Sequence, residues 1–300
     1  EQGFNPSDIV FAGVGKSDWE IREALKYGIG AFNVESLEEL EVINSLALEM
    51  GKVAPVALRI NPNVDAHTHE KITTGLNENK FGIAAEEMLP TIRRTQTMKG
   101  VRFVGLHFHI GSQITTFEPF EALCHRINAL TDVLRREGIS VRILNVGGGL
   151  GIDYEHPEVH PVPDFEGYFS VFKRLIHLEP GQELHFELGR AVVAQCGNLV
   201  TRVLYVKKGV AKRFVIVDAG MTDLVRPAMY GSFHKPENLS AAARHETREE
   251  TYDIVGPICE SSDVFVKGYT MPYTQRGDIV VFRSAGAYGE IMASQYNCRP

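Results

Sequence analysis

The sequence has no apolar run long enough to cross a membrane, and positive charge is in the minority. Lys and Arg number 31 against 38 Asp and Glu, which gives a formal net charge of -7, and no basic stripe with interleaved aromatic residues occurs. The first residues, Glu1 to Asp8, contain neither a basic nor an apolar stretch, so we expect no secretory signal in this part of the chain. These absences argue against a membrane or a nucleic acid as partner and favour a small molecule.

Cysteine is sparse as well, and its spacing excludes two common uses. The four cysteines are far apart and form no CxxC pair: Cys124, Cys196, Cys259 and Cys298. Such spacing is typical of reduced thiols in a cytoplasmic protein and argues against a disulfide framework or a zinc finger. We expect at most one of these cysteines to take part in chemistry.

The first two thirds of the chain alternate short apolar strands with amphipathic helices. The predicted strands are Ile9–Val14, Ile29–Val34, Val53–Ile60, Val101–His109, Val141–Val146 and Glu183–Glu187. The predicted helices include Asp18–Tyr27, Ser36–Met50, Ala85–Thr97 and Pro119–Glu137. About six βα units with polar residues at the strand ends favour an α/β fold of the parallel (β/α)8 TIM-barrel type, although an open doubly wound sheet is not excluded by the pattern. Since such a barrel has eight strands, we expect two more before Glu1.

After Arg190 the pattern changes to strands joined by turns that contain Gly and Pro. The predicted strands are Leu199–Lys207, Arg213–Val217, Glu249–Val255, Asp263–Lys267 and Asp278–Arg283. We therefore expect a barrel domain at residues 1–190 and an all-β domain at residues 191–300, both incomplete, joined by a helix-like connector. The polar stretch Ser232–Arg248 is predicted to be an exposed, mobile loop.

A run of glycines, Gly147-Gly148-Gly149-Leu150-Gly151, closes the strand predicted at Val141–Val146. Glycine tolerates a positive φ and carries no Cβ, so successive N–H groups can converge on a phosphate. The run is therefore a candidate phosphate cradle. A strained turn without any ligand explains the glycines about equally well.

His107 and His109 lie on one face of their predicted strand, which inside a barrel points towards the axis. Two histidines on one face can bind a metal, but no third ligand stands at ligand spacing beside them, so we expect no metal. His109 could instead lie flat against an aromatic ring. A histidine that is hydrogen-bonded within the barrel core is the structural alternative.

Glu187-Leu188-Gly189-Arg190 ends the last predicted barrel strand with a carboxylate and a guanidinium on either side of a glycine. A cofactor with a basic ring nitrogen and a phosphate would use both groups. The carboxylate would keep the ring nitrogen protonated, while the arginine and nearby amides would neutralise the phosphate. An internal ion pair between Glu187 and Arg190 is equally compatible with this motif alone.

Three further segments follow these motifs along the chain: Arg226-Pro227-Ala228-Met229-Tyr230, Cys259-Glu260-Ser261 and Gly286-Ala287-Tyr288-Gly289. The motifs and their order together resemble the fold type III pyridoxal-phosphate decarboxylases, most closely the diaminopimelate decarboxylase family. The resemblance covers essentially the whole chain. It implies pyridoxal 5'-phosphate as cofactor and decarboxylation of meso-diaminopimelate to L-lysine and CO2. The cofactor-binding residues that it implies are His109, Ser112, Gly148, Gly149, Glu187, Gly189, Arg190 and Tyr288.

The same resemblance assigns roles within this site. Glu187 would pair with the ring nitrogen, His109 would stack on the ring, and Cys259 would be the acid that protonates the carbanion. The substrate-binding residues that it implies are Arg190, Arg226, Tyr230, Glu260 and Tyr288. It also implies a homodimer in which Cys259 and Glu260 reach the cofactor of the partner subunit.

The chain departs from the family pattern at two places. No segment matches the strand that carries the cofactor-bearing lysine, and Leu188 stands where the family usually has proline. Lys16 does not replace that lysine and does not fit a P-loop, so we expect it at the surface or at the barrel rim. Two alternatives remain open: a related decarboxylase of arginine, ornithine or a carboxylated polyamine, and a catalytically dead homologue that acts as a binding or regulatory protein.

Overall fold

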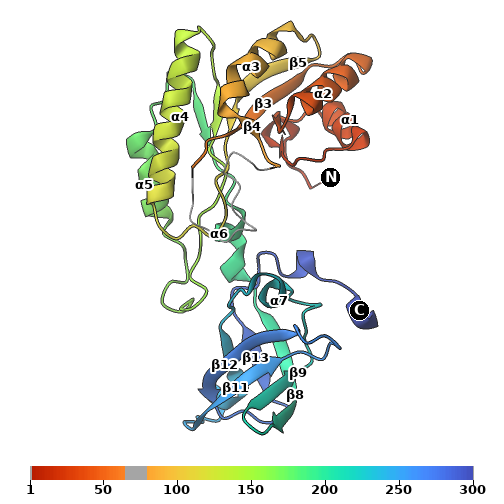
Figure 1. The fold of residues 1–300 in the computed structure, drawn as a ribbon, viewed down its shortest axis with the longest axis vertical. Coiled ribbons are helices and arrows are strands. Elements are labelled where there is room, and N and C mark those ends of the chain that lie inside the picture. Colours follow the sequence, from red (N-terminus) through yellow and green to blue (C-terminus); the bar gives the residue numbers. More distant parts are fainter. Residues whose placement is uncertain (1, 65–79, 300) are drawn as a thin grey trace. The chain divides into compact units, whose positions relative to one another are not determined.

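The computed structural model describes residues 2–64 and 80–299, and the chain forms two compact units (Figure 1). Unit 1 consists of Glu1–Gly149 and Asp164–Leu188, and unit 2 consists of Leu150–Pro163 and Gly189–Pro300. The chain thus passes between the units three times: after Gly149, after Pro163 and after Leu188. The domain bounds expected from the sequence, 1–190 and 191–300, stay a prediction.

Unit 1 is an α/β unit whose strands and helices follow one another along the chain. Its strands are β1 (Val10–Phe11), β2 (Ala31–Val34), β3 (Ala54–Asn61), β4 (Ile83–Ala84), β5 (Val101–His107), β6 (Ile143–Asn145) and β7 (Glu183–His185). Its α-helices are α1 (Asp18–Tyr27), α2 (Leu37–Glu49), α3 (Met88–Thr97), α4 (Glu118–Arg136) and α5 (Phe165–Leu175). Short 3-10 turns add η1 (Pro6–Asp8) and η3 (Ala85–Glu87).

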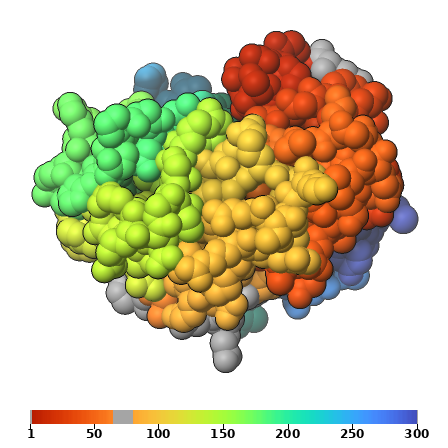
Figure 2. Space-filling model, turned by 90° about the horizontal axis from the view of Figure 1, so that it is seen from above, coloured from red at the N-terminus to blue at the C-terminus, as the bar shows by residue number. Residues whose placement is uncertain are grey.

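The strands described in unit 1 form one sheet in the order β1-β2-β3-β5-β6-β7, with β4 paired to β3. Every pair in this sheet is parallel. Figure 2 shows the segments coloured from orange through yellow to green lying side by side in chain order across one face of this unit. A parallel sheet whose successive strands are joined by helices confirms the predicted barrel class, with six strands on its main path.

Local signals explain where the helices of unit 1 begin. At α1, the Glu20 carboxylate accepts a hydrogen bond from the backbone N–H of Ser17, and Gly28 ends the helix in the left-handed conformation at φ 70°. At α2, the hydroxyl of Ser36 accepts from the N–H of Glu39. Asp164 caps α5 in the same way through the N–H of Gly167. These caps satisfy backbone groups that would otherwise lack a partner at a helix start.

The central strands of the unit 1 sheet are buried on both faces, as expected where helices cover parallel strands. All four residues of β2 are buried, and so are seven of the eight in β3. The last positions of these strands carry polar side chains that are nevertheless buried: Asn33, Arg59, Asn61, His107 and Asn145. Because parallel strands end at the same edge, these side chains mark the carboxyl edge of the sheet, where barrel enzymes place their chemistry.

Unit 2 contains a mixed sheet with the strand order β10-β13-β8-β9-β11-β12. The β9–β11 pair is parallel and the remaining pairs are antiparallel. Its strands are β8 (Leu199–Lys208), β9 (Arg213–Val217), β10 (Pro236–Asn238), β11 (Glu249–Val255), β12 (Val264–Pro272) and β13 (Ile279–Phe282). Its helical segments are α6 (Gly189–Val193), η4 (Ala194–Cys196), α7 (Arg226–Tyr230), α8 (Leu239–Ala243), η5 (Glu290–Met292) and η6 (Tyr296–Cys298). The expected β-rich second part of the chain is confirmed.

The prediction of an exposed, mobile loop at Ser232–Arg248 is wrong, because this segment contains β10 and α8. Its polar side chains form buried hydrogen bonds. Asn238 accepts a hydrogen bond from the N–H of Ala241 at 2.8 Å and donates one to Asp278 at 2.9 Å. Arg244 pairs with Asp278 at 2.6 Å. Capping and ion pairing therefore order a segment whose composition alone is typical of a loop.

The core of unit 2 is formed by the inward faces of its strands, with Tyr252 and Phe282 among the fully buried side chains. The rings of Phe265 and Phe282 stack with their centroids 4.2 Å apart. In the ranges 2–64 and 80–299, no helix has the length and apolar character that crossing a membrane requires.

Candidate active site

The carboxylate of Glu187 lies at the carboxyl edge of the unit 1 sheet and is held by two buried asparagines. Asn33, in β2, donates from Nδ2 to Glu187 Oε1 at 3.0 Å, and Asn145, at the end of β6, donates to the same oxygen at 2.8 Å. Both amides thus saturate Oε1, so that the orientation of the carboxylate is set by three strand ends. Sequence reasoning missed both asparagines. The available signal was their place at the carboxyl ends of two predicted strands.

The second oxygen of this carboxylate faces His107. His107 Nε2 lies 3.7 Å from Glu187 Oε2, and both ring nitrogens of His107 are buried without a hydrogen bond to any described residue. Burial, followed by the charges of Arg59 and His109, holds the pKa of His107 well below its usual range. Because the imidazole is neutral, this approach is a dipolar contact and not an ion pair. His107 is therefore a buried histidine of the barrel core.

The glycine run forms a tight turn against the backbone of Glu187. Gly147 has a φ of +71°, and its carbonyl accepts from the N–H of Glu187 at 2.8 Å. The N–H of Gly147 donates to Asn145 Oδ1 at 2.9 Å. A Cβ on Gly148 would lie 2.2 Å from the carbonyl oxygen of Glu187. Only glycine fits at this point, because any side chain would displace the Glu187 backbone.

His109 lies beside this turn, just beyond β5. Its Nδ1 accepts a hydrogen bond from the N–H of Gly148 at 3.2 Å, so the ring carries its proton on Nε2. Burial and the charge of Arg59 lower the pKa of His109 to about 4. The planar imidazole is therefore uncharged at neutral pH. Ser112 follows in the same loop and is half-buried.

These residues fit the pyridoxal phosphate that the resemblance implies. The ring nitrogen of this group needs an acceptor, its ring needs a flat neighbour, and its phosphate needs close backbone. Glu187, His109 and the Gly147–Gly149 turn offer these three features at one edge of the sheet. The observation that supports a phosphate site most directly is at Gly148, where the neighbouring backbone leaves no room for a side chain.

Unit 2 brings four of the predicted residues together around two buried guanidinium groups. Arg190, in α6, and Arg226, in α7, are 5% and 6% exposed. The guanidinium carbons of Arg190 and Arg226 lie 4.8 Å and 5.6 Å from the ring centre of Tyr288, and that of Arg226 lies 5.8 Å from the ring centre of Tyr230. Burial is the main cause that lowers the pKa of Arg226, and the positive charge of Arg190 acts in the same direction. Two neighbouring buried cations make this a site for an anion.

Two further side chains complete this cluster and were not predicted. Arg190 Nη1 donates to the hydroxyl of Tyr154 at 2.6 Å, and Arg226 Nε donates to His234 Nε2 at 3.3 Å. Tyr154 stands three residues after the glycine run and His234 four residues after Tyr230, without a local pattern that marks either. We refer to Tyr154, Arg190, Arg226, His234 and Tyr288 as the arginine cluster.

Cys259 and Glu260 lie in the turn between β11 and β12. Both are exposed, and their side chains form no hydrogen bond or ion pair with a residue that the structure describes. The turn is held by backbone contacts: Glu260 N–H donates to the carbonyl of Ile258 at 2.8 Å, and Ile258 N–H donates to Asp263 at 2.7 Å. Gly189 is exposed at the start of α6.

Lys16 was expected at the surface or at the barrel rim, and its side chain is not at the surface. Its side chain is 1% exposed, and its Nζ donates to the carbonyls of Gly13 and Asn33 and pairs with Glu39 at 2.6 Å. Three acceptors compensate the buried charge: the carbonyl of Gly13 in the loop before α1, the carbonyl of Asn33 in β2 and the carboxylate of Glu39 in the first turn of α2. Lys16 is thus a structural residue of the barrel rim.

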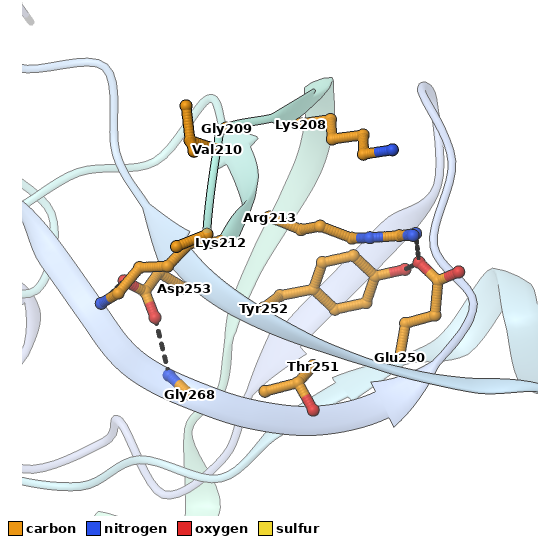
Figure 3. Close-up of a pocket in the computed structure, with 11 residues that line it drawn as sticks. Lys208, Gly209, Val210, Lys212, Arg213, Glu250, Thr251, Tyr252, Asp253 and Gly268 are labelled. Carbon is orange, nitrogen blue, oxygen red and sulfur yellow. Dashed lines mark hydrogen bonds and ion pairs between the residues drawn. The ribbon is translucent and has the colours of Figure 1, made fainter.

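The hollow drawn in Figure 3 contains none of the predicted site residues. It measures about 580 Å³ and lies at the β8–β9 hairpin of unit 2. Four of its five charged groups form pairs, Arg213 with Glu250 and Lys212 with Asp253 at 2.8 Å, and Lys208 is the fifth. The candidate sites therefore remain the carboxyl edge of the sheet in unit 1 and, separately, the arginine cluster in unit 2.

Comparison with known proteins identifies the family of the chain. The family model described as "Pyridoxal-dependent decarboxylase, pyridoxal binding domain" matches residues 1–194. Diaminopimelate decarboxylase from Bacteroides thetaiotaomicron is 59% identical over 99% of this chain and 76% of its own length. The corresponding enzyme from Zymomonas mobilis is 43% identical over 99% of this chain and 69% of its own length.

The fold agrees as well. The crystal structure of Helicobacter pylori diaminopimelate decarboxylase complexed with L-lysine superimposes with a TM-score of 0.92 and 41% identity, covering 99% of this chain and 73% of that one. The match extends over both units, so the parallel barrel sheet and the mixed sheet are the architecture of these relatives. The chain belongs to the pyridoxal-dependent decarboxylases and, within them, to the diaminopimelate decarboxylase family.

Proposed function

We propose that the protein, with pyridoxal 5'-phosphate as cofactor, decarboxylates meso-diaminopimelate to L-lysine and CO2. The observation that carries this proposal is the pair of buried guanidinium groups of Arg190 and Arg226. meso-Diaminopimelate keeps one carboxylate after CO2 has left, and this carboxylate needs a cationic receptor. Ornithine, arginine and carboxylated polyamines have a single carboxylate, which the reaction removes. The arginine pair therefore favours the diaminopimelate reaction over these related decarboxylations.

In unit 1 we assign the cofactor contacts expected from the sequence. Glu187 Oε2 keeps a proton on the ring nitrogen, because Oε1 is occupied by the amides of Asn33 and Asn145. The neutral ring of His109 lies against the cofactor ring, and Gly148, Gly149 and Ser112 lie at its phosphate. When bound, the cofactor supplies the electron sink for the pair that the departing CO2 leaves behind.

In unit 2 we assign the substrate contacts. Arg190, Arg226, Tyr230 and Tyr288 hold the retained carboxylate, and Gly189 and Arg190 also contribute to the phosphate site. Glu260 meets the distal ammonium group of the substrate. Cys259 delivers a proton to the α-carbon, for which a thiol within reach of that carbon suffices.

The protein acts as a homodimer with shared active sites in this proposal. Cys259 and Glu260 are exposed, which leaves them accessible to a partner subunit. In this proposal each site takes Cys259 and Glu260 from one chain and its remaining groups from the other. Cytoplasmic location is part of the same proposal.

The experiment for the activity is a release assay for CO2 with the cofactor-loaded full-length protein. We expect turnover of meso-diaminopimelate and at least a hundredfold lower kcat/KM for ornithine, arginine and L-lysine, in line with the loss of a charged hydrogen-bonding group. Preferred turnover of ornithine or arginine would replace the proposal by a related decarboxylase. No turnover of any of these substrates by cofactor-loaded protein would identify a regulatory homologue.

The shared site is tested by subunit mixing. Full-length Cys259→Ala is combined with a full-length variant that lacks the cofactor-bearing lysine, each inactive alone. Half of randomly assorted dimers are mixed, and each mixed dimer has one intact site, so up to about a quarter of the activity per site returns. If subunit exchange is verified and no activity returns, each site is built within one chain.

A further inference from the structure

Tyr154 is the residue that joins the two arginines of the cluster. The guanidinium carbons of Arg190 and Arg226 lie 5.9 Å and 5.6 Å from the centre of its ring. Its hydroxyl also accepts a hydrogen bond of 2.6 Å from Arg190 Nη1. Tyr154 thus contacts both cations, one through its oxygen and both through its ring.

The direction of this hydrogen bond fixes what the hydroxyl can still do. A guanidinium only donates, so the oxygen of Tyr154 is the acceptor and its own proton points elsewhere. In the described part of the chain, no group accepts that proton. A hydroxyl polarised by a cation is a strong donor to an anion that lies beside the same guanidinium.

His234 holds the ring of Tyr154 and the side chain of Arg226 in place. Its ring meets that of Tyr154 edge-on, with centroids 5.0 Å apart. Its Nδ1 donates to the carbonyl of Arg283 at 3.1 Å, and its Nε2 accepts from Arg226 Nε at 3.3 Å. Both nitrogens are used, so the imidazole is neutral and its position is defined from two sides.

Arg226 is restrained at a second point as well. Its Nη2 donates to the hydroxyl of Ser232 at 3.2 Å, while its Nε is bonded to His234. These two contacts leave Nη1 as the part of the guanidinium that can turn towards a ligand. The cluster is therefore preorganised before any substrate binds, which reduces the entropy lost on binding.

We propose that the hydroxyl of Tyr154 is a third donor to the retained substrate carboxylate, beside Arg190 and Arg226, and that His234 is a positioning residue for this donor set. The proposal rests on the proposed function, since it names the group that recognises the carboxylate which distinguishes diaminopimelate. Tyr154 then contributes to specificity: it binds the substrate end that does not react.

The experiment compares two ligands that differ only in this carboxylate. L-Lysine and 1,5-diaminopentane, which is lysine without its carboxylate, are titrated calorimetrically into the cofactor-loaded full-length protein and its Tyr154→Phe variant. Removing one hydrogen bond to a charged group weakens binding roughly tenfold or more. We expect this loss for L-lysine, and a change below about twofold for 1,5-diaminopentane. In turnover, KM for meso-diaminopimelate rises by a similar factor while kcat changes less than about threefold.

Tyr205→Phe is the matched control, because Tyr205 is 57% exposed on β8 and keeps its ring contact with Arg276 in the variant. This control should bind both ligands as the parent protein does. Equal losses for both ligands in Tyr154→Phe would overturn the proposal, and so would unchanged L-lysine binding. If the parent protein itself does not prefer L-lysine over 1,5-diaminopentane, the proposed function fails instead, which separates the two failures.

Discussion

Replacing Glu187 by Gln in the full-length protein changes which group meets the ring nitrogen of the cofactor. Asn33 and Asn145 both donate to Oε1, so the new side chain keeps its carbonyl oxygen towards these two amides. Its NH2 then occupies the position of Oε2. The ring nitrogen faces a donor in place of an acceptor and loses its proton.

The magnitude follows from the lost charge. A hydrogen bond to a charged group contributes about 1.5–3 kcal/mol, and this one acts in the step that forms the carbanion. A barrier higher by about 3 kcal/mol lowers kcat more than a hundredfold. Cofactor affinity depends on several other contacts, so we expect the variant to retain its cofactor.

The assay measures kcat from CO2 release at saturating meso-diaminopimelate, with the bound cofactor quantified in the same sample. Glu183→Gln is the matched control, because Glu183 begins β7 and forms an exposed pair with Arg142 at 3.3 Å. Exposed pairs contribute little, so this variant should keep its kcat within about twofold. A near-normal kcat of Glu187→Gln with full cofactor content would refute the role of Glu187 in keeping the ring nitrogen of the cofactor protonated.

Three further predictions concern the frame of the site. Gly148→Ala places a Cβ 2.2 Å from the Glu187 carbonyl and should lower the free energy of unfolding by about 1–3 kcal/mol in denaturant titration, whereas Gly15→Ala, with open space around it, should not. Lys16→Met leaves Glu39 without its cation and should cost about 3–5 kcal/mol; recovery of part of this loss in the double variant with Glu39→Gln is the check. Burial lowers the pKa of His234 from 6.5 to about 4, so the unfolded chain binds the proton first, and the free energy of unfolding falls by about 2 kcal/mol from pH 7 to 5. His234→Asn should reduce this pH dependence by the same amount, and an unchanged slope would contradict the assignment.

The repeating βα pattern was predictable because its signals are local. The bounds of α1, Asp18–Tyr27, agree with the prediction, since a capping box begins this helix and Gly28 ends it. The strands β5 and β9 begin at the residues predicted from the sequence, Val101 and Arg213, each at or directly before an apolar run. The glycine run and Glu187 were also recognisable, because glycine at a strand end and a carboxylate after the next strand are informative without the fold.

Local sequence patterns did not predict the structure of segments that are ordered by contacts with residues distant in the sequence. Asp278 lies far along the chain from Ser232–Arg248 but orders this segment through Asn238 and Arg244. Composition therefore predicted a loop in place of β10 and α8. For Lys16 the sequence left the surface and the barrel rim open, and only the contacts with the carbonyl of Asn33 and the carboxylate of Glu39 show that its charge is buried at the rim.

The sequence by itself determined the family, the alternation of strands and helices, and the identity of most candidate site residues. Only the tertiary structure decided what holds them. Asn33 and Glu187 are 154 residues apart, and they meet because β2 and β7 end at the same edge of one parallel sheet. Tyr154 and His234 show the same limit, because no local pattern marks a tyrosine or histidine that only the fold places between two arginines.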